Sequence, residues 1–472
     1  MTAQAALPLE QTNPLANGPA QGGLHSRPLL LLERTMYREG RTPFTSVFTV
    51  TLVGAMHEEN LRRALLTLQS KHELLRSVVE DVDGQPHFVL QDHPAPIPLR
   101  IVERDGDDDW QEEVRKEWTV PFAASHEPLA RLVWIRGSYT SELILLAHHC
   151  ICDGQSGMIL LQQCLRACDD PEQDLKSVDV LKGIEDLVPA SLRNDRRFQR
   201  RVHWKMRLLR MGLALKRRDG AEKRTCITSE QMYFQRCRLD ARTSTAIAAH
   251  SKAQGVTVFA VAAVSFLQAF REIRGKGALR KAYTMVNARR FLSQLTPDAL
   301  FGIAPGVELC LKELPTGEIT KTGFWKGARA IKIGVTRRID RLGRGMLEYL
   351  VGLESLHDKY NRLVGDTEGK SEVRHLTLSN MGRLDLPTQY RTFTLEKVYS
   401  PLVMVSPTPA NTVVLSSFAG RLEFAIVSDT QSLPQTQAVA ILQRAMSILR
   451  SCAGVEVSTT PASLTAAGMT GE

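Results

Sequence analysis

The sequence has little of what marks membrane-spanning, exported or fibrous proteins. Its most apolar stretches, Val256–Ala269 and Leu143–Ala147, fall well short of the roughly 20 residues that cross a bilayer. The first residues lack a basic start followed by an apolar block, so we expect no signal peptide. No short repeat runs along the 472 residues, which excludes collagen and coiled coils. We therefore expect a globular, cytoplasmic protein with no transmembrane segment.

Cysteines and aromatic residues are also sparse. The eight cysteines have no framework spacing, and without an export signal free thiols are expected rather than disulfides. Aromatic residues make up only 6% of the chain, and no nucleic-acid reader motif is present. Stacking on bases needs aromatic side chains, so the composition argues against a nucleic-acid partner.

The length and the hydrophobic patterning predict two α/β halves. A chain of 472 residues is too long for one core of ordinary size. Thr45–Val53 has the β-branched and aromatic content of a strand, and an amphipathic helix is predicted to start near His57. The second half repeats this mixed texture, with a buried helix over Thr257–Arg271 and a strand at 281–288. We therefore expect an α/β protein of two domains.

Positive charge is concentrated in one segment. Ser191–Arg224 holds 13 Lys and Arg against three acids, whereas the whole chain carries a net charge of only +9. Leucines alternate with these charges, which predicts an amphipathic helix or helix pair bridging the two halves. A solvated face, a site for coenzyme A phosphates, a site for an acidic carrier protein and a lipid surface all stay open as interpretations.

These patterns predict five regions along the chain. They are a flexible leader (1–23), an N-terminal subdomain (24–190), the basic helical bridge (191–224), a C-terminal subdomain (225–455) and a flexible tail (456–472).

One segment concentrates residues capable of chemistry. In LILLAHHCICDGQSG, an apolar strand leads into His148 and His149, followed by Asp153 and Gly154. Neighbouring strand residues point to opposite faces, so only one histidine can face a cleft. Gly154 permits a tight turn at the end of the strand, where a loop can present an imidazole to a ligand.

This segment resembles a known family. HHCICDG matches the HHxxxDG signature of the chloramphenicol acetyltransferase-like superfamily, which includes peptide-synthetase condensation domains, plant BAHD acyltransferases and phthiocerol dimycocerosyl transferases. Weaker similarities follow in the family's order, at HELLRSVV, EPLARLVWI, VNARR and LTLSNMG. The resemblance implies two α/β sandwich subdomains of similar fold with an active-site tunnel at their interface.

The resemblance also implies roles for individual residues. His149 would be the general base, and His148 would pack behind it. Asp153 would shape the loop by pairing with an arginine, for which Arg289 is favoured and Arg290 stays open. Because an alcohol is a poor nucleophile at neutral pH, a neutral imidazole is well suited to accept its proton.

Three further residues complete the implied site. Gly154 would leave room for the pantetheine arm of the donor, and Ser379 or Asn380 would donate to the oxyanion. The donor would be an acyl thioester of coenzyme A or of a carrier protein, which docks on the basic segment around Arg193–Arg224, and no bound cofactor is expected. The plant DFGWG sequence is absent and no carrier or adenylation domain is evident, so a free-standing acyltransferase of lipid or polyketide-type metabolism is expected.

Other interpretations of the same residues are open. An amine acceptor would give an amide, a silent relative would only bind, and a hydrolase is disfavoured because no separate nucleophile motif is present. Cys150 and Cys152 beside the histidines suggest a metal, but no second ligand cluster exists, so we expect no metal site. Three further histidines, His72, His203 and His375, have no partner identifiable in the sequence and are assigned to core or surface.

Overall fold

The computed structural model describes most of the chain. The described residues are 26–40, 44–170, 178, 181–215, 229–275, 277, 279–311, 320–361, 375–405, 411–452 and 454. The predicted leader (1–23), the tail (456–472) and the last part of the basic segment lie outside them. The mixed α/β class predicted from the sequence is confirmed.

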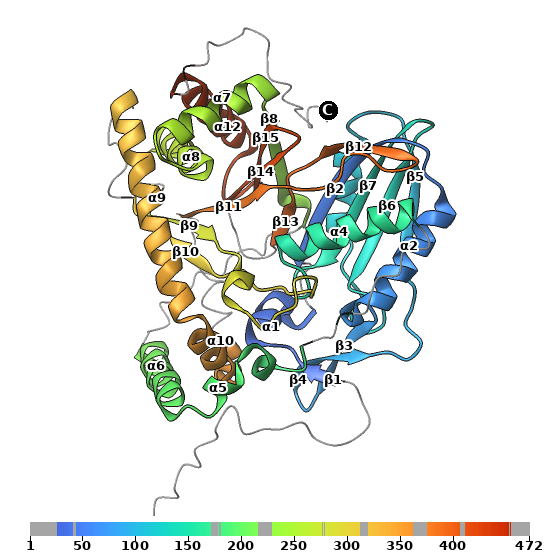
Figure 1. Cartoon of the computed structure of the whole chain (residues 1–472), viewed down its shortest axis with the longest axis vertical. Helices are drawn as coiled ribbons and strands as arrows, with labels where there is room; N and C mark the ends of the chain where they lie inside the picture. Colours follow the sequence, from blue (N-terminus) through green and yellow to red (C-terminus); the bar gives the residue numbers. More distant parts are fainter. Residues whose placement is uncertain are drawn as a thin grey trace, which may run out of the picture.

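A six-stranded sheet forms the centre of the N-terminal subdomain (Figure 1). Its order is β12-β2-β7-β6-β5, with β13 also paired to β2. Strand β7 is central and fully buried, as its unbroken apolar run requires. Helices α2 (Glu58–Lys71) and α4 (Gly154–Asp169) pack together, and α4 lies against β2 and β7. The strands are β2 (Phe44–Gly54), β5 (Leu99–Glu103), β6 (Ala130–Arg136), β7 (Thr140–His148), β12 (Phe393–Val398) and β13 (Leu402–Val405).

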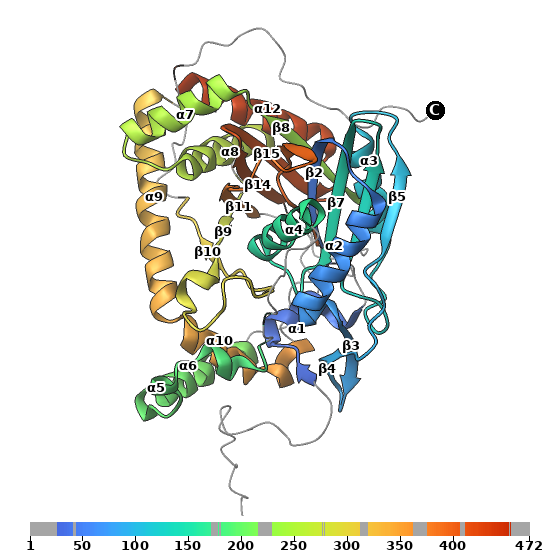
Figure 2. The same ribbon diagram turned by 45° about the vertical axis from the view of Figure 1, so that its right-hand side comes forward.

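A second six-stranded sheet, ordered β10-β9-β11-β14-β15-β8, forms the C-terminal subdomain (Figure 2). Helices α8 (Val258–Arg274) and α12 (Gln435–Cys452) pack on each other and on this sheet. Helix α7 (Ala241–Ala253) packs against β15 and α8, and α9 (Lys321–Arg344) packs against α8 and β10. Strands β14 and β15 form a hairpin, and its two turn residues, Ala419 and Gly420, both have positive φ. The strands are β8 (Met232–Arg238), β9 (Lys281–Met285), β10 (Gly306–Glu308), β11 (His375–Arg383), β14 (Asn411–Phe418) and β15 (Arg421–Asp429).

The two halves are interlocked. Strands β12 and β13 follow β11 in the chain, yet both pair antiparallel with β2 of the N-terminal sheet. Side chains of the C-terminal sheet, including Phe234 and Val427, belong to the same buried cluster as β2 and β7. The boundary between the subdomains is therefore a packed apolar interface with strands exchanged across it.

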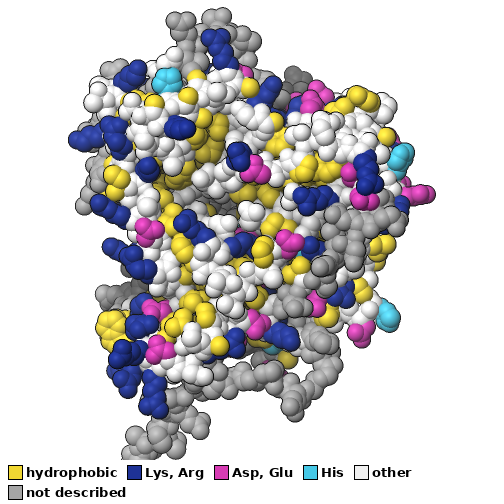
Figure 3. Space-filling view, in the orientation of Figure 1, with side chains coloured by type: hydrophobic (Ala, Val, Ile, Leu, Met, Phe, Trp, Pro, Cys, Tyr) yellow, Lys and Arg dark blue, Asp and Glu magenta, His cyan; other side chains and the backbone are white. Residues whose placement is uncertain are grey.

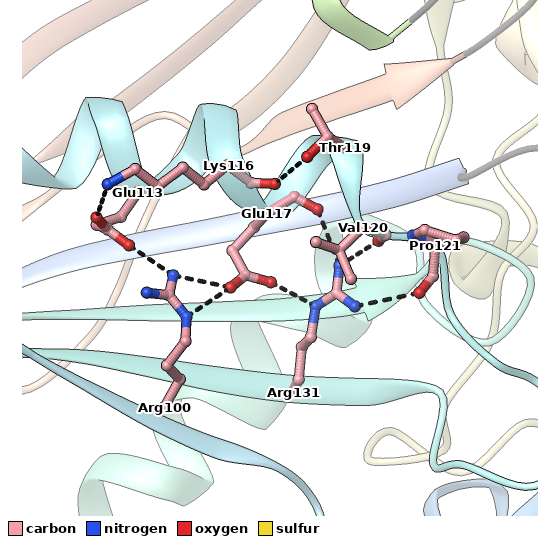
Figure 4. Close-up of polar contacts among 8 residues, drawn as sticks. All are labelled: Arg100, Glu113, Lys116, Glu117, Thr119, Val120, Pro121 and Arg131. Atoms are coloured by element: carbon pink, nitrogen blue, oxygen red, sulfur yellow. Dashed lines mark hydrogen bonds and ion pairs between the residues drawn. The ribbon is translucent and has the colours of Figure 1, made fainter.

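Helix α3 (Asp109–Thr119) is fixed at this interface by charged side chains. Glu117 lies between Arg100 and Arg131, at 2.8 and 2.6 Å, and Glu113 pairs with Arg100 at 2.6 Å (Figure 4). The pinned helix presents Trp110, whose ring stacks on Tyr399 at 4.3 Å between centroids. The network thus holds an aromatic contact between the two halves of the chain.

A third apolar cluster lies below the two sheets. A small sheet of β1 (Ser26–Pro28), β4 (Gln85–Leu90) and β3 (Ser77–Val82) lies at this end (Figure 1). The cluster gathers residues of α1 (Leu31–Tyr37), α6 (Arg196–Leu215), α10 (Met346–Glu354) and the loop 288–303. The predicted basic helix is confirmed as α6, and it packs against α10 of the second half.

No single helix of the described chain is long and apolar enough to cross a membrane. Helices α7 and α8 together pass the length and composition test, but the pair is bent by 105°.

Candidate active site

Strand β7 carries the His-His pair to the boundary between the subdomains. The strand ends at His148, and the backbone N–H of His149 donates to the carbonyl of Phe44 at 2.7 Å. A tight turn follows, in which the N–H of Ile151 donates to the carbonyl of His148 at 3.1 Å. Because the turn is tied to β2 on one side, the two imidazoles have fixed and opposite surroundings.

His148 faces the core of the N-terminal subdomain. Its ring lies 5.8 Å from Phe122 and 6.0 Å from Tyr37, centroid to centroid, and its Nδ1 accepts from the N–H of Cys150 at 3.2 Å. Burial, with a smaller effect of His149, lowers the pKa of His148 to about 3. The side chain is therefore a neutral packing group at physiological pH.

His149 is half-buried and its ring edge contacts Phe44, with centroids 5.1 Å apart. Its Nδ1 is buried and makes no hydrogen bond in the described structure. Nε2 also makes no hydrogen bond to a described residue, but it is not one of the buried atoms left unpaired, so it is accessible. Burial lowers the pKa of His149, and its own backbone, Asp153 and the Cys152 backbone oppose the shift. A neutral imidazole with one open nitrogen is the form that accepts a proton.

Asp153 caps α4 with its side chain. Its Oδ1 accepts from the backbone N–H of Ser156 at 2.7 Å and from the Ser156 hydroxyl at 2.9 Å. The same carboxylate lies 3.5 Å from Nη2 of Arg289, with both side chains largely buried. A carboxylate at a helix N-terminus is favoured by the helix dipole, and these contacts tie Asp153 to the start of α4.

Arg289 is the arginine that reaches Asp153. Its Nη1 donates to the carbonyl of Ala299 at 2.9 Å and its Nη2 to the Ser156 hydroxyl at 2.6 Å. The guanidinium of Arg290 lies instead over the ring of Phe291, 5.0 Å from its centroid. In the structure, the ion pair of Asp153 is thus with Arg289, while Arg290 lies on Phe291.

Ser156 and Gly302 join the turn to the loop 288–303, and neither was singled out from the sequence. The Ser156 hydroxyl accepts from the N–H of Phe301 at 3.0 Å, and the N–H of Asp153 donates to the Phe301 carbonyl at 3.0 Å. A Cβ at Gly302 would lie 2.5 Å from the carbonyl oxygen of Cys150 and 2.6 Å from that of His149. Only a glycine therefore lets this loop lie directly against the histidine turn. The sequence marks these positions only by a serine two residues after Gly154 and a glycine directly after Phe301.

Gly154 marks a contact between the subdomains. A Cβ at this position would lie 2.6 Å from the sulfur of Met381 on β11. The register of β11 against β14 shifts between Asn380 and Gly382, and the N–H of Gly382 donates to Oδ1 of Asn380 at 3.1 Å. This bulge directs Met381 toward the start of α4.

Ser379 and Asn380 lie on the same strand, but neither makes a hydrogen bond with His149 in the described structure. Ser379 is half-buried and lines a small apolar cavity between β11, β14 and α8, and Asn380 is exposed. The described structure therefore joins neither residue to the His149 turn by a hydrogen bond.

The remaining cysteines and histidines considered from the sequence are either packed in the core or exposed on the surface. Burial raises the pKa of the Cys150 and Cys152 thiols well above their usual value, and within the described ranges no three His, Cys, Asp or Glu side chains are placed to hold a metal. His72 has a partner that the sequence did not reveal: Nε2 lies 2.7 Å from Oε1 of Gln163, and burial lowers its pKa to about 4. His375 packs edge-on against Tyr283, and His203 is exposed on α6.

A family model and curated relatives match parts of this chain. The condensation-domain family model matches residues 35–277, just over half of the chain. The nonribosomal peptide synthetase kk1B of Curvularia clavata is 32% identical over 127 residues, which are 26% of this chain and 1% of that protein. The chain thus corresponds to only a few per cent of the length of such curated relatives.

Solved structures share the fold at low identity. The TRI3 trichothecene 15-O-acetyltransferase of Fusarium sporotrichioides has a TM-score of 0.71 at 13% identity, covering 96% of this chain and all of that one. Polyketide synthase associated protein 5 of Mycobacterium tuberculosis has a TM-score of 0.61 at 16% identity, covering 91% of this chain and all of that one. At such identities the similarity shows the two-subdomain fold.

Proposed function

The chain belongs to the condensation-domain family, and from that premise we propose that it moves an acyl group from a thioester to an alcohol, with His149 as the general base. The observation that carries the proposal is the asymmetry of the His-His pair. His148 is enclosed in the core, whereas His149 lies at the subdomain boundary with a lowered pKa and one open nitrogen.

In the proposed step, Nε2 of His149 takes the proton of the acceptor hydroxyl as its oxygen attacks the thioester carbonyl carbon. A C–O bond forms and the carbonyl oxygen becomes an oxyanion. The oxyanion then collapses, the C–S bond breaks, and the leaving thiolate takes the proton back from the imidazolium. The products are an ester and a free thiol, and no acyl-enzyme is formed.

The residues around His149 act as positioning groups in this proposal. Asp153 and Arg289 hold the turn between β7 and α4 through Ser156, which also binds the loop at Phe301. A base that must lie within hydrogen-bond reach of the acceptor gains from such a rigid support.

The donor thioester is proposed to be carried by coenzyme A or by a carrier protein, with its pantetheine arm passing Gly154. Met381 lies against this glycine, so its flexible side chain would have to move for the arm to pass. Ser379 or Asn380 is proposed as the oxyanion donor, since both lie on β11 beside Met381.

The ester product is favoured over an amide by one similarity. The name of the fold relative with a TM-score of 0.71 is that of an O-acetyltransferase. An amine acceptor would use the same base, so condensation to an amide is the second candidate, and a silent binding relative is the third.

The test is thiol release from a panel of acyl-coenzyme A donors, with and without mixed alcohols and amines. His149→Ala is compared with His93→Ala, a control that removes an exposed histidine elsewhere on the surface. We expect acceptor-dependent release by the wild type and by His93→Ala, and its loss in His149→Ala. Release by His149→Ala within a few-fold of wild type would refute the role of His149 as base. Silence across the panel would favour a carrier-bound donor or a protein that only binds.

A further inference from the structure

Helix α6 has two apolar stripes, and only one of them is covered. Phe198, Val202 and Met206 are buried against the cluster that includes α10. Trp204, Leu208 and Met211 follow the spacing i, i+4 and i+7 on another face, and they are 63%, 45% and 49% exposed. A surface helix normally has one apolar stripe, which packs on the core, so a second, exposed stripe indicates a binding surface for another molecule.

The exposed stripe is flanked by cations that have no ion-pair partner among the described residues. Helix α6 contains no Asp or Glu. Three of its cations are paired, Arg201 and Lys205 with Glu348 and Arg210 with Asp358. No ion pair to a described residue exists for Arg196, Arg197, Arg200 or Arg207. At about 100° per residue, Arg200 and Arg207 lie along one side of the stripe that begins at Trp204.

The position of α6 leaves this face open. In both ribbon views α6 lies at the lower left edge of the molecule, beside α5 (Ala190–Arg193) and α10 (Figure 1 and Figure 2). The space-filling view shows Lys and Arg side chains gathered at the same lower left corner (Figure 3). The covered stripe and the ion pairs to Glu348 hold the helix in place, so its outer face is formed before any partner arrives.

We propose that α6 is a docking surface for an anionic lipid bilayer. Trp204, Leu208 and Met211 enter the headgroup region, while Arg200 and Arg207 lie over the lipid phosphates and carboxylates. Tryptophan prefers the membrane–water interface, because its ring is apolar and its N–H is polar. An exposed apolar stripe with arginines beside it and no acids is the composition of a helix that lies in the plane of an anionic membrane surface.

The helix supplies its own reporter for the test. The chain has five tryptophans, and the other four, Trp110, Trp118, Trp134 and Trp325, are at most 5% exposed. Quenching of fluorescence by acrylamide therefore reports mainly on Trp204. The full chain is mixed with vesicles of phosphatidylcholine alone or with about one third phosphatidylserine, and both sedimentation and quenching are measured.

We expect the protein to sediment with the phosphatidylserine vesicles, to dissociate in high salt, and to show Trp204 protected from acrylamide. Two variants test the two parts of the surface, Arg200→Gln with Arg207→Gln, and Trp204→Ala with Leu208→Ser. The first variant removes two cations that are attracted to the anionic lipids, and the second removes two apolar side chains that enter the headgroup region. Each should therefore weaken vesicle binding by more than about tenfold.

The matched control is Lys321→Gln with Lys326→Gln, which removes the same charge from exposed positions at the start of α9. It should bind vesicles like the wild type, and all three variants should melt near the wild-type temperature since the changed side chains are exposed. No sedimentation with either vesicle, or equal losses in the control and the α6 variants, would overturn the proposal. Trp204 left accessible on vesicles, with transfer from a carrier-bound donor slowed by the α6 variants, would overturn it in favour of an acidic protein partner.

Discussion

Gly302→Ala offers a sharp test of how the site is built. The loop around Gly302 lies against the carbonyl oxygens of His149 and Cys150, and a methyl group has no room there. The new Cβ would lie 2.5 and 2.6 Å from these oxygens, which belong to the backbone and cannot rotate away. Ordinary contact begins near 3.4 Å, so the loop or the histidine turn must shift by roughly 0.8–0.9 Å.

A shift of this size acts on the hydrogen bonds that join the loop to the turn. The bond from the Asp153 N–H to the Phe301 carbonyl and the bond from the Phe301 N–H to Ser156 are both 3.0 Å long. Lengthening both weakens two buried bonds, each worth on the order of 1 kcal/mol or more when its groups stay buried. With the cost of overpacking, we expect a loss of about 2–4 kcal/mol of stability.

The assay is thermal unfolding together with thiol release, and Gly212→Ala is the control. A Cβ at Gly212 would meet nothing within 4 Å, and the residue lies in the helix α6. This control should be neutral or stabilising by up to about 1 kcal/mol, because alanine favours helices over glycine. Gly302→Ala should melt at a lower temperature and transfer more slowly, since His149 moves with the turn. A Gly302→Ala variant that matches the wild type in both measurements would refute the reasoning.

Three further predictions concern the same region. The pH profile of kcat/KM should be flat above neutrality and fall on the acid side below pH 6.5, because burial lowers the pKa of His149; an acid limb centred above 7 would contradict this. Stability should decrease as pH falls below 6.5, because His72 (pKa about 4) and His148 (pKa about 3) bind protons in the unfolded chain but stay neutral in the folded protein. By pH 5 each histidine should cost about 2 kcal/mol, which urea unfolding at pH 7 and 5 measures, and an unchanged midpoint would count against it. Asp153→Ala leaves the buried Arg289 without its ion-pair partner, so it should lower the free energy of unfolding by on the order of 3 kcal/mol and reduce the activity. Asp153→Asn should lose less stability. A wild-type melting temperature for Asp153→Ala would speak against the pairing.

Individual strands and turns were predictable because the spacing of apolar residues indicates which side chains are buried. The strand expected over Thr45–Val53 forms within β2, and the unbroken apolar run Leu143–Ala147 forms the central strand β7. The hairpin at Ala419 and Gly420 needs two residues with positive φ, and the sequence places small residues there. Periodicity and turn chemistry act over a few residues, so they can be read without knowing the fold.

Partners distant in the chain were beyond the reach of such patterns. Nothing in the residues of β12 and β13 indicates that they pair with β2, more than 300 positions away, instead of with the sheet of their own half. In the same way, nothing in the sequence distinguishes Gly302 from the other glycines among the 32, because its close contact with the carbonyl of Cys150 is visible only in the structure. Register and close approach depend on which surfaces meet, and that is decided by the packing of the whole chain.

For this protein, the sequence by itself determined the two α/β halves, the basic helix and the HHxxxDG turn, because each is a short pattern whose spacing reflects one local structure. Only the tertiary structure decided which histidine is open, which arginine meets Asp153, and which face of α6 stays uncovered. The physical reason is the same in each case. Burial, ion pairing and exposure are properties of two surfaces in contact, and a single stretch of sequence describes only one of them.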